Sequence, residues 1–237
     1  MLGRMRTSFV VLLIALGLVA ASAESPHAEP DARAADYASR AVRGWTVQVE
    51  RGLEREAAGE RALELLAAKL FDVERAVPEP ALAKLRAVPI WLSLDDRVAP
   101  CMCYHVSPEW LSEHGFDPRK AKGVEIANAA RFVEWSREQP WMVLHELAHA
   151  YHDRELGHAH AGVRAAFERA RAAKALESVL HWDGGRVKAY ALENDQEFFA
   201  EASEAWFGTN DFWPFVRAEL RDWDPEVAKL MQEAWGG

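Results

Sequence analysis

The sequence predicts an α+β fold in which a small mixed or antiparallel sheet packs on a helix and the C-terminal part is mostly helical. Short segments with strand character occur in the first half of the chain, at residues 44–50, 88–94 and 123–129. Segments with helical periodicity dominate the second half, and half of the 237 residues are hydrophobic. With no repeat and no linker after residue 40, one domain over residues 41–237 is expected.

The expected strand at 123–129 precedes the expected helix after Pro140, and it is predicted to form the edge of the sheet. A hairpin with a two-residue turn is expected at Asp183-Gly184, and its second strand would carry Tyr190. The expected helices cover residues 54–76, the segment after Pro140, residues 163–177, Asn194 to Gly208, residues 211–221 and residues 225–235.

The first 23 residues have the features of a secretory signal peptide. Arg4 and Arg6 precede the apolar stretch SFVVLLIALGLVA, and the small residues ASA at 21–23 fit a cleavage site near Ala23. An uncleaved membrane anchor is the alternative, although the apolar stretch is short for a bilayer span. We expect a secreted or periplasmic protein without stable membrane insertion, and a disordered leader over residues 24–40.

The charge of the chain is acidic. The formal net charge is −9, and it becomes −11 when residues 1–23, which contain two arginines and no acidic residue, are removed. An acidic mature chain argues against nucleic acid as a partner. The oligomeric state is not indicated by the sequence.

The only two cysteines, Cys101 and Cys103, lie in the segment CMCYH. A disulfide between them would close a small, strained ring. His105 makes a metal site conceivable here, but more ligands at zinc spacing would be expected, so we interpret this segment as structural.

The segment WMVLHELAHAYHD at 141–153 contains two histidines at helical spacing. His145 and His149 are four residues apart, so on a helix both imidazoles leave the same face. Zinc, bound about 2.0–2.1 Å from each nitrogen, needs two ligands on one face. Glu146 points to one side of the pair, from where it can reach a metal-activated water without ligating the metal. The alternative is a pair of core histidines that hydrogen-bond to the protein itself.

A catalytic zinc site needs a third protein ligand. The third and sixth residues after His149 are His152 and Glu155, so the H-x-x-G-x-x-H continuation of one zinc-peptidase class is absent. His158 and His160, in a glycine-containing loop, remain possible ligands.

The stronger candidate for the third ligand is Glu197, because it lies one helical turn from a second acidic residue, Glu201, on the same predicted face. One carboxylate could ligate zinc while the other holds the free N–H of a ligand histidine. The alternative is a solvated acidic face formed by these two residues and Glu204.

The segments HELAHA and YALENDQEFFAEASEAW resemble the gluzincin metallopeptidases, and among them the family of the anthrax lethal factor catalytic domain and the Pro-Pro endopeptidases. The similarity is specific over residues 141–153 and 190–207. It implies a zincin-like fold. The chain has no room for the docking domains of a toxin, so a toxin function is not implied.

The resemblance also implies roles for individual residues. One zinc ion per chain would be held by His145, His149 and Glu197, with Glu146 as the general base. Tyr190 would face the metal and help to stabilise the oxyanion. Asn194 matches the family pattern as well, and Asn194 and Glu201 would support the ligands.

Three classes of function remain open. The first is a secreted zinc metallopeptidase that hydrolyses peptide or protein substrates by a zinc-activated water, with Glu146 as the base. The second is a catalytically inactive zincin-like domain that binds an extended peptide or a glycan. The third is a structural protein whose histidine motif is accidental.

Overall fold

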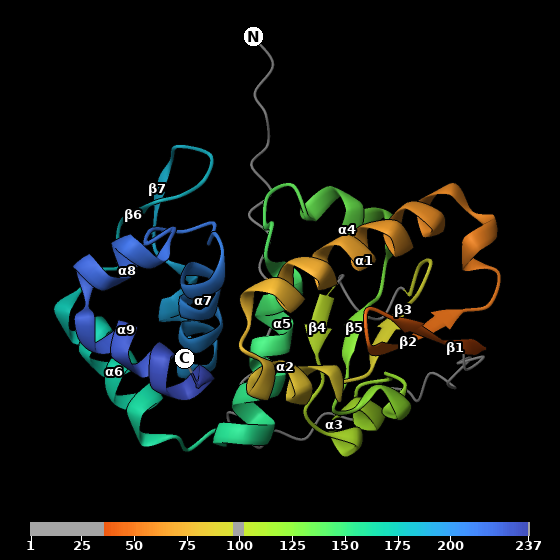
Figure 1. The fold of residues 1–237 in the computed structure, drawn as a ribbon, viewed down its shortest axis with the longest axis horizontal. Helices are drawn as coiled ribbons and strands as arrows, with labels where there is room; N and C mark the ends of the chain where they lie inside the picture. The colour runs from red at the N-terminus through yellow and green to blue at the C-terminus, as the bar shows by residue number, and fades with distance from the viewer. Residues whose placement is uncertain (1–35, 97–101, 237) are drawn as a thin grey trace, which may run out of the picture. The chain divides into compact units, whose positions relative to one another are not determined.

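The computed structural model describes residues 36–96 and 102–236 of the protein. A five-stranded mixed sheet lies in the N-terminal half of the chain (Figure 1). The sheet has the strand order β1-β2-β3-β5-β4, with antiparallel pairs at both ends and parallel pairs between them. Its strands are β1 (Tyr37–Val42), β2 (Trp45–Glu50), β3 (Ile90–Leu92), β4 (Met102–Tyr104) and β5 (Val124–Ile126). The α+β class is therefore confirmed.

Two predictions about the sheet were wrong. Strand β1 begins at Tyr37, so the last residues of the expected leader belong to the sheet, where they pair with β2. Strand β5 is not the edge, because β4 pairs with it antiparallel and forms the edge instead. Strand β4 lies in the segment CMCYH, to which we had assigned no strand. The expected signal peptide, residues 24–35 of the leader, and Cys101 lie outside the described residues.

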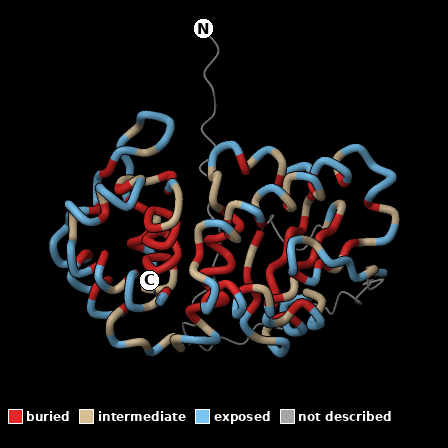
Figure 2. The backbone as a smooth tube through the Cα atoms, in the orientation of Figure 1, coloured by how far each residue is buried: buried red, intermediate tan, exposed pale blue. Residues whose placement is uncertain are grey.

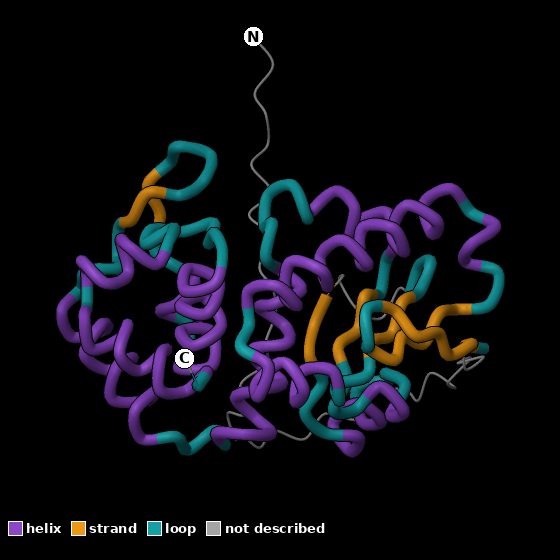
Figure 3. Tube along the Cα trace, viewed as in Figure 1, coloured by secondary structure: helices purple, strands orange, loops and turns teal. Residues whose placement is uncertain are grey.

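Helices account for most of the remaining chain (Figure 3). The expected helices at the histidine motif and after Asn194 are confirmed, and α2, α3 and α4 were not predicted. None of the described helices is long and apolar enough to cross a membrane. The helices are α1 (Ala57–Ala76), α2 (Glu79–Arg86), α3 (Pro108–Glu113), α4 (Ala129–Trp135), α5 (Met142–Tyr151), α6 (Ala161–Ala173), α7 (Asp195–Phe207), α8 (Arg217–Trp223) and α9 (Pro225–Trp235).

Helix α5 is the central element of the core. It packs against β4, β5, α1 and α2 on one side and against α7 on the other (Figure 1). All ten of its residues are buried, which explains why its sequence is apolar around the whole circumference (Figure 2). Polar side chains on such a helix lose their hydration, so each one needs a partner within the protein or a bound ligand.

Helix α7 is nearly as buried as α5, and the sequence defines both of its ends. Asn194 caps it, since the side-chain oxygen accepts from the N–H groups of Gln196 and Glu197 at 3.0 and 2.8 Å. Gly208 follows its last residue. Because ten of its thirteen residues are buried, the alternative of a solvated acidic face is wrong.

The expected hairpin forms from β6 (Val179–Leu180) and β7 (Arg186–Val187), but two details of the prediction were wrong. The loop spans residues 181–185 and is closed by the bond from the His181 N–H to the Gly185 carbonyl, so it is longer than a two-residue turn. Tyr190 does not lie on a strand. It begins a short 3-10 helix, η4 (Tyr190–Leu192), that leads into α7.

Candidate metal centre

Helices α5 and α7 bring three donor groups together. His145 and His149 leave one face of α5, and Glu197 projects from the first turn of α7. Glu197 Oε2 lies 3.0 Å from His145 Nε2 and 3.3 Å from His149 Nε2. Two imidazole nitrogens and one carboxylate oxygen thus converge on a single point.

These three residues fit a zinc ion. Their donor atoms lie within 4.8 Å of one another, and all three side chains are buried. His149 Nε2 is buried and makes no well-formed hydrogen bond within the described chain, and the nearby Glu197 Oε2 lies 3.3 Å from it, so this nitrogen is directed into the centre with room for a ligand bond. Two imidazoles and one carboxylate form a known catalytic zinc set that leaves one coordination position open.

The charge around this point also favours a cation. Five carboxylates are buried here, and in the described parts of the chain no lysine or arginine lies within ion-pair distance of any of them. Buried carboxylates without a counter-charge are costly. A divalent cation would supply the missing positive charge. The five residues are Glu146, Glu197, Glu201, Glu204 and Asp211.

The pKa values of His145 and Glu197 in the metal-free protein reflect the same excess of buried carboxylates. Burial alone would lower the pKa of His145, but its hydrogen bonds to Glu197 and Glu204 raise that pKa well above the ordinary value. Burial would raise the pKa of Glu197, yet His149 and His145 lower it to about 2. Without a metal, a proton on His145 therefore provides the positive charge that a bound ion would provide instead.

We had predicted that Glu201 holds the second ring nitrogen of His145, and this was wrong. Glu204 holds it instead. His145 Nδ1 donates to Glu204 Oε1 at 2.7 Å, whereas its distance of 3.9 Å to Glu201 is too long for a hydrogen bond. Glu201 accepts from Asn210 Nδ2 instead, at 3.0 Å. Burial and the neighbouring carboxylates of Asp211 and Glu204 raise the pKa of Glu201 well above its ordinary value.

Glu204 was missed as a functional residue although a signal for it exists. It follows Glu197 by seven residues, two helical turns, and so shares its face of α7. Asp211, whose pKa is raised to about 7 by burial and by Glu204, gave no signal in the sequence.

Glu146 lies beside the donor groups and is bound by the edge strand. Its Oε2 accepts from the backbone N–H of Tyr104 on β4 at 2.9 Å. Burial raises the pKa of Glu146. Glu146 contacts neither histidine nitrogen, which agrees with a base that does not ligate the metal. A backbone donor such as the Tyr104 N–H leaves no trace in the sequence.

Tyr104 is itself fixed from the other end of α5. Its hydroxyl donates to Asp153 Oδ2 at 2.7 Å, and Lys122 Nζ donates to the same oxygen at 2.5 Å. Asp153 lies in the π-helical extension of α5, η3 (His152–Leu156). Tyr104 thus ties the edge strand to the helix of the motif twice, through its backbone N–H and through its hydroxyl.

Tyr190 reaches the centre even though it is not on a strand. Its hydroxyl lies 3.3 Å from Glu197 Oε1, and burial together with the charge of Glu197 raises its pKa. The hydroxyl therefore stays protonated and can donate. Asn194, by contrast, forms the N-cap that fixes the backbone at Glu197.

The other histidines that we considered do not belong to this centre. His158 Nε2 lies 3.2 Å from Asp153, and His160 caps α6 by accepting from the Val163 N–H at 3.3 Å. Neither occurs in the candidate metal groups found within the described residues. Glu197 is therefore the third donor that the structure supplies.

No protein-family model matches the chain, and neither a curated protein nor a solved structure is detectably similar to it. The case for a function therefore rests on the geometry of the centre.

Proposed function

We propose that the protein is a secreted zinc-dependent metallopeptidase with a zincin-like fold. The observation that carries this proposal is the convergence of His145 Nε2 and His149 Nε2 on one oxygen of Glu197, at 3.0 and 3.3 Å. Glu146 lies beside them as a carboxylate that is not a donor to the same point. A site that only binds a metal has no need of such a group.

Each residue has a defined task in this proposal. A zinc ion held by His145, His149 and Glu197 would supply a Lewis acid, which would activate a water molecule and polarise the scissile carbonyl. Glu146 accepts the proton of that water and passes it to the leaving amine. Tyr190 donates its hydroxyl hydrogen to the developing oxyanion. Glu204 holds His145 through Nδ1, so that Nε2 faces the metal.

The edge strand β4 indicates where a peptide substrate would bind. The His105 N–H bonds to the Gly123 carbonyl inside the sheet, so the preceding N–H, that of Tyr104, points to the open edge. There it is taken by Glu146. An extended peptide that adds to this edge would place its backbone next to the base.

A peptide-library assay with the variant Glu146→Gln tests the proposal. The glutamine keeps size and shape but cannot accept a proton, so cleavage should fall at least ~10²-fold while zinc content stays at the wild-type level. Glu138→Gln, an exposed glutamate near the motif, is the matched control and should cleave normally.

Two outcomes of this assay contradict the proposal. Cleavage by Glu146→Gln at the wild-type rate would exclude Glu146 as the base. Wild-type protein with bound zinc that cleaves no peptide in the library would instead indicate a domain that binds an extended peptide or a glycan.

A further inference from the structure

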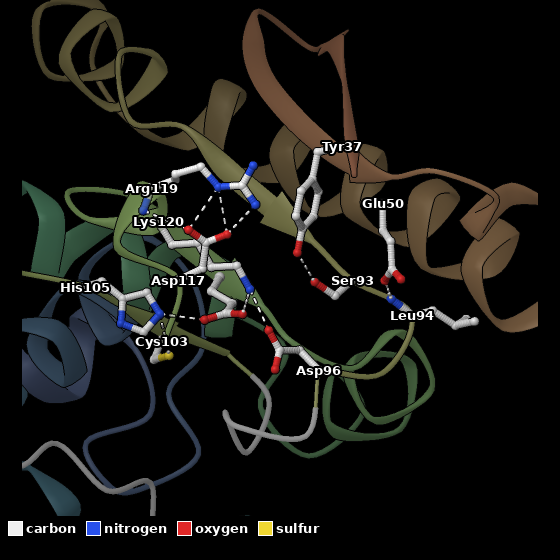
Figure 4. A network of polar contacts seen from close by, with 11 residues as sticks. Tyr37, Glu50, Ser93, Leu94, Asp96, Cys103, His105, Asp117, Arg119 and Lys120 are labelled. Carbon is white, nitrogen blue, oxygen red and sulfur yellow. Dashed lines mark hydrogen bonds and ion pairs between the residues drawn. The ribbon is translucent and has the colours of Figure 1, made fainter. Parts of the chain in front are cut away.

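A second polar cluster, which is largely buried, lies around Cys103, His105 and Lys120 (Figure 4). Side chains alternate along β4, so Cys103 leaves the sheet on the face opposite Met102 and Tyr104, which are buried in the core. Across the ladder Cys103 pairs with Glu125 on β5, which is fully buried. His105 follows β4 and turns back toward the same pair.

Three donor groups of different chemistry meet in this cluster. His105 Nε2 lies 3.6 Å from Cys103 Sγ and 2.6 Å from Glu125 Oε2. The thiol, imidazole and carboxylate donor atoms all lie within 4.8 Å of one another. In a catalytic Cys-His-acid arrangement, one ring nitrogen of the histidine faces the cysteine and the other faces the acid. Here the same nitrogen, His105 Nε2, faces both Cys103 and Glu125, so the cluster is not of that kind. It is a set of atoms that converge on one point.

Lys120 sets the orientation of Glu125. Its ammonium group is buried and donates to Glu125 Oε1 and, at 2.7 Å, to Asp96 Oδ2. One positive charge is therefore shared by two carboxylates, and the Oε2 atom of Glu125 is left on the side of His105. In metal sites, a hydrogen bond to the second oxygen of a carboxylate is a common means of fixing the ligating oxygen.

We propose that Cys103, His105 and Glu125 bind a second divalent ion, of the zinc class. A thiolate together with an imidazole selects Zn²⁺ or similar ions over Ca²⁺ and Mg²⁺, which prefer oxygen ligands alone. Binding releases the thiol proton of Cys103, and His105 would bind as a neutral imidazole through Nε2 with its N–H on Nδ1. The thiolate, Glu125 and Asp96 carry three negative charges, and Lys120 with the metal carries three positive charges.

The second ion would act on the edge strand. It links β4 to β5 through Cys103 and Glu125, and the next residue, Tyr104, donates its backbone N–H to Glu146. The site would thereby hold the edge in register beside the motif. Its existence does not depend on the proposed peptidase activity, since it shares no donor group with His145, His149 and Glu197.

Cobalt titration of the metal-free, full-length protein tests this site. Thiolate bound to Co²⁺ gives a charge-transfer band in the near ultraviolet, which imidazole and carboxylate ligands do not give. Wild-type protein should show this band and bind one more equivalent of Co²⁺ than Cys103→Ala, in which the band is absent. His149→Ala should keep the band, because it changes only the other centre.

Two controls make the test decisive. Cys101→Ala removes the only other thiol and should keep the band, which assigns the band to Cys103. Metal-free wild type and Cys103→Ala should melt at similar temperatures, and Zn²⁺ should raise the melting temperature more in the wild type. Absence of the band in wild type or in Cys101→Ala, or its persistence in Cys103→Ala, overturns the proposal.

Discussion

Two buried polar clusters meet at strand β4, and they differ in how their charge is balanced. The centre between α5 and α7 buries five carboxylates, and the described chain gives them no lysine or arginine. The cluster behind β4 contains Glu125 and Asp96, and both bind the ammonium group of Lys120. The first cluster thus lacks a protein cation, whereas the second contains one.

This difference indicates which cluster needs a metal ion to balance its buried negative charge. Burying a charge without a partner costs far more than burying a paired one. At the first centre the proton on His145 is the available substitute for a metal, and it is lost when the histidine must act as a ligand. At the second cluster a metal would be bound mainly by deprotonating Cys103. Removal of metal should therefore disturb the charge balance of the first centre more than that of the second cluster.

The largest expected effect is that of Glu197→Ala. It removes a ligand, so zinc affinity at this centre should fall by more than the ~100-fold that is typical for loss of a supporting residue, and cleavage should be lost. Glu193→Ala, an exposed residue just before α7, is the control and should retain both. Metal analysis after dialysis measures the effect, and a Glu197→Ala protein with full zinc content would exclude Glu197 as a ligand.

A large but purely kinetic effect is expected for Tyr190→Phe. The substitution removes one hydroxyl donor that acts in the transition state, so kcat should fall about 10²–10³-fold with zinc content and folding unchanged. Steady-state kinetics with a cleaved library peptide measures it. A packing residue would show only a small loss of stability, and unchanged kcat would assign Tyr190 to that role.

A smaller effect separates Glu204 from Glu201. Glu204→Gln weakens the bond that orients His145, so zinc affinity should fall about 10–100-fold, and added zinc should restore part of the activity. Glu201→Gln is the matched variant on the same helix. It keeps a hydrogen-bonding partner for Asn210 and should change zinc affinity little. A greater loss of affinity in Glu201→Gln than in Glu204→Gln would reverse our assignment.

An effect of a different kind, a pH dependence of stability, is expected from His152. Both of its ring nitrogens are buried without a hydrogen-bond partner in the described chain, and burial with the nearby His158 lowers its pKa to about 4. As pH falls from about 6.5 to about 4, the unfolded chain takes up a proton that the folded chain does not. The contribution of His152 to the free energy of unfolding should therefore fall by up to about 3 kcal/mol.

Urea unfolding of the metal-free protein across this pH range measures the effect. His152→Gln should reduce the slope of stability against pH, whatever its effect at neutral pH. His114→Gln, at an exposed position, should leave the slope unchanged. An equal slope in wild type and His152→Gln would show that His152 is accessible to protons in the folded state.

The parts of the fold and the site that depend on local chemistry could be predicted from the sequence. The spacing of His145 and His149 places both on one helix face, and Asn194 marks the start of α7. Glu197 then enters the core from the first turn of that helix. Periodicity and capping act within a few residues of the chain, and so they can be read without knowledge of the packing.

The parts that depend on how elements pack could not be predicted. Glu201 and Glu204 both lie on the buried side of α7, and only the packing of α7 on α5 decides which of them reaches His145. The edge strand β4 was not predicted, and its contact with Glu146 uses a backbone N–H. Position in a sheet and backbone donors depend on tertiary structure and carry no residue-type signal.

The zinc content of three purified full-length proteins tests the central claim, that His145, His149 and Glu197 form a metal centre. Wild type, His149→Ala and His158→Ala would be dialysed side by side and analysed by elemental mass spectrometry. We predict that His149→Ala holds about one equivalent of zinc less per chain than wild type. His158→Ala, whose histidine forms an ion pair with Asp153, should hold the same amount as wild type. Equal zinc content in His149→Ala and wild type would contradict the claim.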